Sequence, residues 1–78
     1  MVGVTNKLIA ILREQMDLDG RIITEDTDIV EDLSADSLDI IELMMAVEAE
    51  YGLSIEEEQV LTFRTVGDVA QYISEHTS

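Results

Sequence analysis

Hydrophobic residues recur at helical spacing in the first part of the chain. One face of this stretch carries apolar side chains at i, i+3 and i+4 intervals, namely Val4, Leu8, Ile11 and Leu12. Thr5 is a suitable N-cap, so we predict a helix that starts there and runs to about Met16. The segment Asp17-Leu18-Asp19-Gly20 ends this helix, because glycine supplies the backbone freedom that a turn needs.

A second helix is predicted from Ser37 to Tyr51, with Asp36 as its N-cap and Gly52 as its stop. When residues are placed at about 100° per step, one face is apolar and predicts the core side. This face comprises Ile40, Leu43, Met44, Val47 and Tyr51. A second apolar patch lies roughly 100° to 160° away from Ile40 around the same helix. It comprises Leu38, Ile41 and Met45.

Between these helices, from Arg21 to Ala35, the pattern has no clear period, which predicts a long loop instead of strands. We expect one short helical turn around Ile29–Leu33. Scattered apolar residues should anchor the loop to the bundle, namely Ile22, Ile23, Ile29, Val30 and Leu33. A loop of this length in so small a domain is more often functional than accidental.

The last third of the chain predicts two more helices. A short one is expected at about Glu57–Leu61, with inward-facing residues Val60, Leu61 and Phe63. Thr65 and Asp68 have the spacing of a capping box at the start of the last helix. Its buried stripe is Val66, Val69, Ala70 and Ile73. The fold class is therefore all-α: a four-helix bundle of three long helices and one short helix, with a long loop between the first and second helices. Residues 1–78 should form a single domain.

Composition narrows the classes of function. The chain has 78 residues, no cysteine and one histidine, His76, which excludes disulfides and argues against Cys- or His-based metal and nucleophile chemistry. With 46% hydrophobic residues in a periodic pattern, disorder is not expected. No apolar run is long enough to span a bilayer, and the N-terminus lacks the features of a signal peptide. We therefore expect a cytoplasmic protein.

Charge is the strongest compositional feature. Eighteen acids and four bases give a net charge of −14, and thirteen of the acids lie between Ile22 and Phe63, where there is no lysine or arginine. Such a surface repels nucleic acid and anionic membranes and attracts basic partners. We expect a monomer whose middle part, including the second helix, is the anionic face.

The patch of Leu38, Ile41 and Met45 is larger than a core requires. It borders Glu42 and Glu48, and apolar residues beside carboxylates suit a transient docking surface for basic partners. The alternative is that the helix is simply apolar over a wide arc in a small bundle. This alternative applies most to Ile41, which lies nearest the core edge and whose assignment to core or surface stays open.

Ser37 would be the first residue of the second helix. Its hydroxyl would lie beside unpaired backbone N–H groups and the positive end of the helix dipole, where a phosphate is favoured. Taken alone, a serine there more often only assists capping. Nothing basic lies near it in sequence, so it is a poor catalytic nucleophile, and another enzyme would have to modify it. Ser34 is a competing hydroxyl in the loop.

The segment Asp36-Ser37-Leu38-Asp39, preceded by Val30-Glu31-Asp32-Leu33 and followed by Ile41-Glu42-Leu43, resembles the attachment-site motif of acyl carrier proteins. The resemblance extends over nearly the whole chain. It includes the Leu8–Leu12 stretch, the Glu48–Tyr51 stretch, and Thr65-Val66-Gly67-Asp68-Val69 leading to Tyr72-Ile73.

The resemblance implies a carrier and not an enzyme. A phosphopantetheinyl transferase, with Mg²⁺, would move 4′-phosphopantetheine from coenzyme A onto Ser37, next to Asp36. The thiol of this arm would carry acyl chains as thioesters between enzymes of fatty-acid or polyketide synthesis. The acyl chain could be sheltered between the helices. Basic patches of these partner enzymes would contact Leu38, Asp39, Ile41, Glu42, Met45 and Glu48. One position departs from the family: Ser34 stands where a glycine is expected.

Three alternatives remain beside this interpretation. A carrier of peptidyl, D-alanyl or other acyl groups would share the site, and the sequence does not decide between the fatty-acid and polyketide pathways. A calcium-binding domain fits poorly, because placing Asp19 and Gly20 at positions 5 and 6 of an EF-hand loop puts Gln15 at position 1 and Asp26 at position 12. No specific metal site is therefore expected. The third alternative is a helical adaptor without a covalent group.

Overall fold

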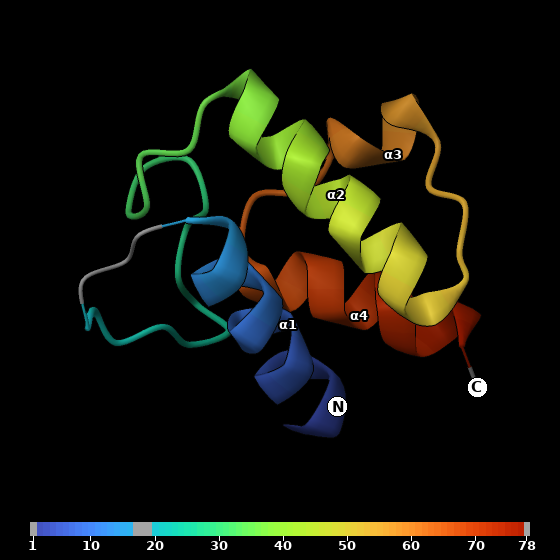
Figure 1. Ribbon diagram of the computed structural model, residues 1–78, viewed down its shortest axis with the longest axis horizontal. Helices are drawn as coiled ribbons and strands as arrows, with labels where there is room; N and C mark the ends of the chain where they lie inside the picture. The colour runs from blue at the N-terminus through green and yellow to red at the C-terminus, as the bar shows by residue number, and fades with distance from the viewer. Residues whose placement is uncertain (1, 17–19, 78) are drawn as a thin grey trace.

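Four helices make up the regular structure of the chain in the computed structural model, which describes residues 2–16 and 20–77. They are α1 (Val2–Gln15), α2 (Ser37–Tyr51), α3 (Glu57–Val60) and α4 (Val66–His76) (Figure 1). Within the described ranges no strand forms, and the single β-type contact is an isolated bridge between Asp28 and Thr65. The predicted all-α bundle of three long helices and one short helix is confirmed. Of the turn predicted at Asp17–Gly20, residues 17–19 lie outside the described residues, while Gly20 has the left-handed φ of 74° that glycine adopts without steric cost.

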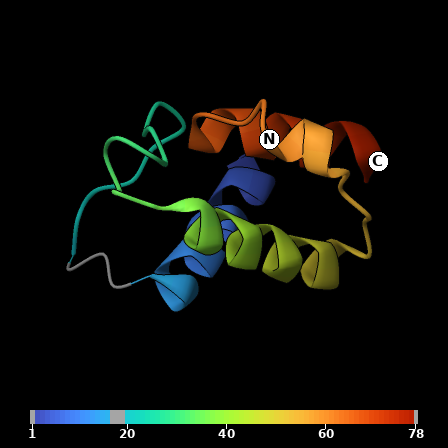
Figure 2. The same ribbon diagram turned by 90° about the horizontal axis from the view of Figure 1, so that it is seen from above.

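Helix α1 crosses between α2 and α4 and packs against both (Figures 1 and 2). The core forms where these three helices meet, and its largest fully buried side chains are Leu8, Leu12, Leu43, Ile73, Val47, Val66 and Val69. The apolar stripes predicted for α1 and α4 supply most of this core, so the helical spacing identified the buried faces correctly. Helix α3 and the long loop lie at the periphery of the three-helix core.

The start of the first helix differs from the prediction. Helix α1 begins at Val2, so Thr5 lies within it and is not its N-cap. The Thr5 side chain is buried, and its hydroxyl donates a hydrogen bond to Glu25 Oε1 at 3.1 Å. A threonine that resembles a cap in sequence thus serves as a contact between the helix and the long loop.

The long loop between α1 and α2 is held against the start of α4 by main-chain hydrogen bonds. The Ile29 N–H donates to the Arg64 carbonyl at 2.9 Å. In the opposite direction, the Val66 N–H donates to Thr27 O at 3.0 Å and the Gly67 N–H donates to Glu25 O at 2.9 Å. The loop therefore satisfies N–H groups that a helix N-terminus otherwise leaves unpaired.

Only some of the predicted anchors of this loop are buried. Ile23, Ile29 and Leu33 point into the core, whereas Ile22 is 83% exposed and Val30 is 46% exposed, so these two were wrongly predicted as anchors. A turn forms at residues 29–33, as expected, and the Asp32 N–H donates to Asp28 O at 2.9 Å within it.

Helix α3 is shorter than predicted and ends at Val60. Leu61, which was expected to face inward, is 80% exposed, whereas Val60 and Phe63 are partly buried and pack against the core. In this helix of four residues Val60 faces the core, and Leu61, the next apolar residue, points away from it.

The start of α4 carries the predicted capping box. Thr65 Oγ1 accepts from the Asp68 N–H at 3.1 Å, and Asp68 Oδ2 accepts from the Thr65 N–H at 3.1 Å. Gly67 permits a close approach of the loop at this point, because a Cβ atom there would lie 3.0 Å from the carbonyl oxygen of Glu25.

Candidate functional site

The N-terminus of α2 is closed by a reciprocal capping box. Asp36 Oδ1 accepts from the Asp39 N–H at 2.9 Å, and Asp39 Oδ2 accepts from the Asp36 N–H at 3.2 Å. The predicted N-cap and the predicted helix bounds are both confirmed, and Gly52 terminates the helix in the left-handed conformation with φ 66°. With Asp36 as the N-cap, Ser37 is the first residue of the helix, and the capping bonds on either side of it fix its backbone.

The amides at the start of α2 differ from those at the start of α4. Among the residues that the structure describes, the N–H groups of Ser37 and Leu38 donate no hydrogen bond, whereas those of Val66 and Gly67 donate to carbonyls of the long loop. Free N–H groups at the positive end of a helix dipole bind phosphate well. The start of α2 is thus the more suitable of the two for an anion.

Ser37 itself is exposed, and its hydroxyl makes no hydrogen bond with any described residue. His76 lies at the end of α4 instead, where its Nδ1 is 2.8 Å from the Tyr72 carbonyl. Without a base beside it the hydroxyl is not activated as a nucleophile by this chain. Within residues 2–16 and 20–77, no group of three or more His, Cys, Asp or Glu could hold a metal ion.

Helix α2 separates its apolar residues as the helical wheel predicted. On the inner face, Leu43, Met44 and Val47 are buried, and Ile40 and Tyr51 are partly buried. On the outer face, Leu38 and Met45 are each 62% exposed and Ile41 is 52% exposed. The open question about Ile41 is thereby answered: it belongs to the surface.

The acids that flank this outer patch do not behave alike. Glu42 is exposed, and Asp39 is partly buried in the capping box. The Glu48 carboxylate turns back to accept the Ile55 N–H at 2.6 Å, so it holds the segment between α2 and α3 in place. Of the three, Glu42 is the most accessible to a partner.

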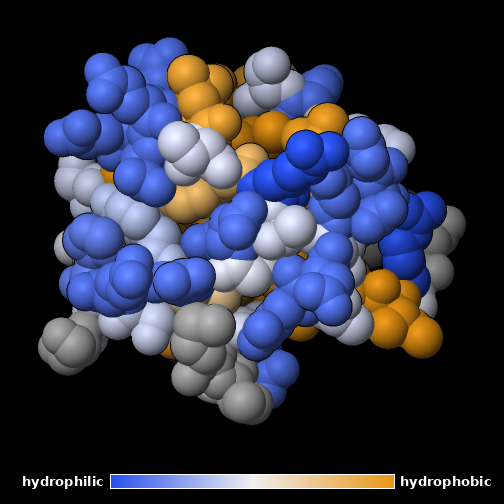
Figure 3. Space-filling view, turned by 180° about the vertical axis from the view of Figure 1, so that it is seen from behind, coloured by the Kyte–Doolittle hydropathy of each residue, from blue (hydrophilic) through white to orange (hydrophobic). Residues whose placement is uncertain are grey.

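Two adjoining apolar hollows separate α2 from α3. The one beside Ser37 has a volume of about 330 Å³ and is lined by Val30, Ser37, Ile40, Ile41, Glu57, Val60, Leu61 and Phe63. The other is about 270 Å³ and is lined by Ile41, Met44, Met45, Glu48, Ile55, Glu57 and Val60. Seen from behind, hydrophobic atoms gather at the top of the molecule, where α3 lies, and in a separate group at the lower right, while most of the remaining face is hydrophilic (Figure 3).

Sequence reasoning missed part of this lining. Val30 and Leu61 were predicted to face inward, but they are exposed at the rim of the hollow beside Ser37. Their position depends on how the long loop meets α3, which local periodicity does not encode. The sequence alone carried no signal for this position.

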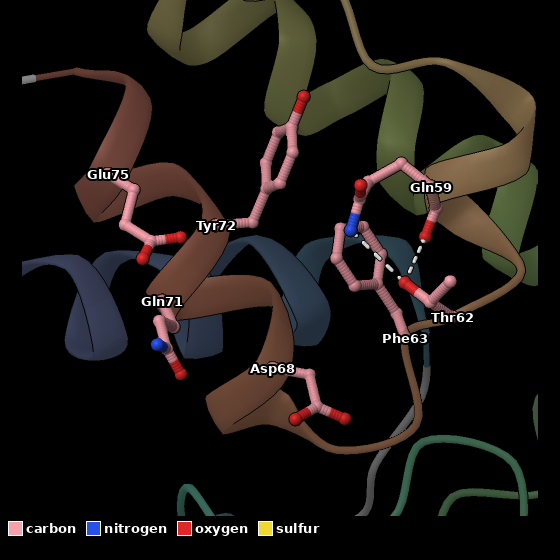
Figure 4. Close-up of a pocket in the computed structure, with 7 residues that line it drawn as sticks. All are labelled: Gln59, Thr62, Phe63, Asp68, Gln71, Tyr72 and Glu75. Atoms are coloured by element: carbon pink, nitrogen blue, oxygen red, sulfur yellow. Dashed lines mark hydrogen bonds between the residues drawn. The ribbon is translucent and has the colours of Figure 1, made fainter.

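A third hollow, of about 210 Å³, is polar and has no residue of α2 in its lining (Figure 4). It lies between α4 and the segment that contains Gln59 and Thr62, whose side chains bond at 3.1 Å. The ring of Phe63 reaches both this hollow and the apolar one beside Ser37, so it forms the wall between them.

All four bases of the chain are engaged within the molecule. Lys7 Nζ pairs with Glu50 at 3.0 Å, and this hydrogen-bonded ion pair raises the pKa of Lys7. Arg13 donates to the Arg21 carbonyl, and Arg21 donates to the Asp32 carbonyl. Arg64 Nε pairs with Asp28 Oδ2 at 2.9 Å and Arg64 Nη2 with Glu31 Oε1 at 3.6 Å. The acids of the α2 outer face therefore meet no internal base.

Ser34 adopts a left-handed backbone conformation with φ 56°. Glycine reaches this region without steric cost, whereas a serine does so with some strain. The glycine that was expected at this position therefore matches the backbone that the chain adopts, and Ser34 keeps that backbone in spite of its Cβ atom.

Known proteins resemble this chain in sequence and in fold. The family model described as "Phosphopantetheine attachment site" matches residues 6–73. The chain therefore belongs to the phosphopantetheine-attachment family.

Its relatives within this family are acyl carrier proteins. Acyl carrier proteins of Rickettsia canadensis (strain McKiel) and Rickettsia rickettsii (strain Iowa) are each 47% identical to it over 75 residues, or 96% of this chain and 87% of the relative. A solved structure provisionally described as an acyl carrier protein from Mycobacterium tuberculosis superimposes with a TM-score of 0.86 at 28% identity, covering 92% of this chain and 96% of that one. The chain thus functions as an acyl carrier with phosphopantetheine as its prosthetic group. In the part that the structure describes, no helix has the length and apolar character needed to cross a membrane.

Proposed function

We propose that Ser37 carries the 4′-phosphopantetheine arm and that acyl chains of fatty-acid biosynthesis travel on it as thioesters. The observation that supports this most directly is the exposed Ser37 hydroxyl at the start of α2, beside two backbone N–H groups that bond to no described residue. Asp36 contributes by fixing the helix start through its capping bond to Asp39. No other described hydroxyl lies at the open start of a long helix.

The modification needs a transferase, because Ser37 has no base beside it. In the transfer, the Ser37 oxygen forms a bond to the phosphorus next to pantetheine in coenzyme A. The pyrophosphate linkage breaks, adenosine bisphosphate leaves, and the hydroxyl proton passes to a base of the transferase, with Mg²⁺ neutralising the phosphate charge. The chain is in this proposal a substrate and carrier, with no catalytic residue of its own.

The outer face of α2 is proposed as the docking surface. Leu38, Ile41 and Met45 supply exposed apolar area, and methionine adapts to partners of different shape. The flanking Asp39, Glu42 and Glu48 belong to a stretch without bases, so they attract the basic patches of the transferase and of the synthesis enzymes.

The apolar hollow beside Ser37 is proposed to shelter the acyl chain. Its volume of about 330 Å³ suits a short acyl chain, and the second hollow, which shares Ile41, Glu57 and Val60 with it, extends the path along α2. We propose further that the chain acts as a single-domain protein in the cytoplasm, and as a monomer, since its net charge of −14 makes copies repel one another.

The experiment that tests the proposal is arm addition followed by intact mass. With coenzyme A, Mg²⁺ and a promiscuous phosphopantetheinyl transferase, the wild type should gain one phosphopantetheine unit. Ser37→Ala should gain none, whereas Ser34→Ala should gain one at the wild-type rate. A shift that survives in Ser37→Ala and disappears in Ser34→Ala would move the site to the loop. No shift in any variant would favour an adaptor without a covalent group.

A further inference from the structure

The hollow beside Ser37 has walls from two segments that are far apart in sequence. Val30, in the long loop, forms one side of its rim, and Leu61 and Phe63, in the linker from α3 to α4, form the other. Val30 and Leu61 are both exposed, so neither is held in place by burial in the core. The width of the opening therefore depends on what joins the loop to the linker.

Arg64 joins them. Its Nε lies 2.9 Å from Asp28 Oδ2 and its Nη2 lies 3.6 Å from Glu31 Oε1, so one guanidinium contacts the acids on both sides of Val30. The Ile29 N–H adds a main-chain bond of 2.9 Å to the Arg64 carbonyl. Contact with Asp28 raises the pKa of Arg64, and bonds from the Glu31 N–H and from Arg64 lower the pKa of Asp28. We call this arrangement of Arg64, Asp28 and Glu31 the arginine clasp.

The two sides of the clasp are not equally fixed. On the linker side, Phe63 packs edge-to-face against Tyr72 of α4, with ring centroids 5.5 Å apart and planes at 69° (Figure 4). On the loop side, the backbone of Val30 is held by its N–H bond to Asp28 Oδ1 and by the bond from the neighbouring Ile29 N–H to the Arg64 carbonyl, but its side chain is exposed. The Val30 side chain is thus less constrained than the ring of Phe63.

We propose that Arg64 is a positioning residue for the acyl chain: by clasping Asp28 and Glu31, it fixes the position of Val30 at the rim opposite Leu61 and limits the access of water to an acyl chain held beside Ser37. This inference rests on the proposed sheltering of the chain in that hollow. The Arg64 side chain is itself 70% exposed, so its removal loses little buried area. Its effect on the opening is therefore separable from an effect on the core.

The rate of thioester hydrolysis measures this protection. In hydrolysis, hydroxide adds to the thioester carbonyl, the carbon–sulfur bond breaks, and the leaving thiolate takes the proton of the acid, so that a free carboxylate and the thiol of the arm remain. An octanoyl chain is long enough to occupy the hollow, whereas an acetyl group is not. The ratio of the two hydrolysis rates in the same variant therefore reports shelter, and the acetyl rate corrects for general changes at the thioester.

Four proteins, each loaded on Ser37 by the transferase from octanoyl or acetyl coenzyme A, make the comparison. Arg64→Gln should hydrolyse octanoyl about threefold faster than the wild type, as expected when the exposed ion pairs of Arg64 with Asp28 and Glu31 are lost, with the acetyl rate unchanged. Arg64→Lys keeps the charge and should recover part of the protection. Lys7→Gln removes an ion pair that is not part of the clasp, between Lys7 on α1 and Glu50 on α2, and should behave as the wild type.

The hydrolysis rates are measured well below the melting temperature of every variant. The melting temperatures are determined by circular dichroism. If Arg64→Gln is too unstable to load, the wild type is measured at increasing NaCl concentration instead. Added NaCl should speed octanoyl hydrolysis, because it weakens the ion pairs of the clasp. An octanoyl-to-acetyl ratio that is equal in Arg64→Gln and wild type overturns the proposal, as does an equal rise in Lys7→Gln. Failure of the proposed function is distinct, since the wild type would then accept no acyl arm at all.

Discussion

Asp28 is bound from two sides by different kinds of donor. Its Oδ1 accepts the N–H groups of Val30 at 2.9 Å and Glu31 at 2.8 Å, while its Oδ2 accepts Arg64 Nε at 2.9 Å. All these bonds favour the charged carboxylate, and they lower its pKa from the usual 3.8, the Glu31 N–H more than Arg64. Because the folded-state pKa is the lower one, this stabilisation is present above pH 3.8 and is lost as the pH falls through the lowered pKa.

The titration of Asp28 should therefore respond only in part to loss of Arg64. In Arg64→Gln the midpoint should rise but stay below 3.8, since the bond from the Glu31 N–H remains. NMR of the Asp28 carboxyl carbon across acid pH measures it. A full return to 3.8 in the variant would show that the turn amides contribute nothing to the shift.

Ser34→Gly tests the left-handed backbone before the candidate site. A serine at φ 56° carries a steric cost that glycine does not, although glycine loses more entropy on folding. We expect a net gain of about 0.5 kcal/mol in the free energy of unfolding, measured by urea denaturation. Ser34→Ala, which keeps the Cβ atom, should show no gain. A loss of stability in Ser34→Gly would mean that the Ser34 hydroxyl contributes more than the backbone strain costs.

At the level of elements, the close approach of the long loop to the start of α4 depends on the absence of a side chain at Gly67. A methyl group there would meet Glu25 O at 3.0 Å, so the loop would have to move. Gly67→Ala should lower the free energy of unfolding by about 1–2 kcal/mol. Gly3→Ala is the matched control, because a Cβ atom there meets nothing within 4 Å and alanine favours a helix. Equal effects at the two positions would exclude the contact with Glu25 as the cause.

The elements that the sequence predicted correctly are those with local signals. Asp36, Asp39, Thr65 and Asp68 bond within three residues, so their caps could be recognised from spacing alone. The start of α1 was misplaced because Thr5 bonds to Glu25, twenty residues away. The same reason explains Val30 and Leu61: their exposure follows from the contact between the loop and the α3–α4 linker, which no local pattern contains.

The candidate site divides in the same way. Ser37 and the outer face of α2 follow from one capped helix with two apolar faces, and the structure agrees with that geometry. The hollow beside Ser37 is formed by residues of the long loop, of α2, and of α3 with its following linker. The arginine clasp joins Arg64 to Asp28, which lies 36 residues earlier in the sequence. Charge counting showed that the bases lie outside the stretch from Ile22 to Phe63 but could not pair any of them, Arg64 included, with a partner.

For the whole molecule, a net charge of −14 acts against the compact state through self-repulsion. Moderate NaCl or Mg²⁺ should therefore raise the melting temperature at neutral pH, as measured by circular dichroism. Screening also weakens the ion pairs of Lys7 and Arg64, but these are few beside the excess of acids. A melting temperature that does not change with ionic strength would indicate that the acids lie too far apart to repel one another.

The engagement of all four bases has a consequence for the arm in the proposed holo form. Each guanidinium or ammonium is already held by an acid or a carbonyl of the chain, so none is positioned to grip the phosphodiester on Ser37. Within residues 2–16 and 20–77, the donors left at this position are the backbone amides of Ser37 and Leu38. In that form a visiting enzyme would have to draw the acyl chain out of the hollow beside Ser37, but it would break no ionic contact between the arm and the carrier.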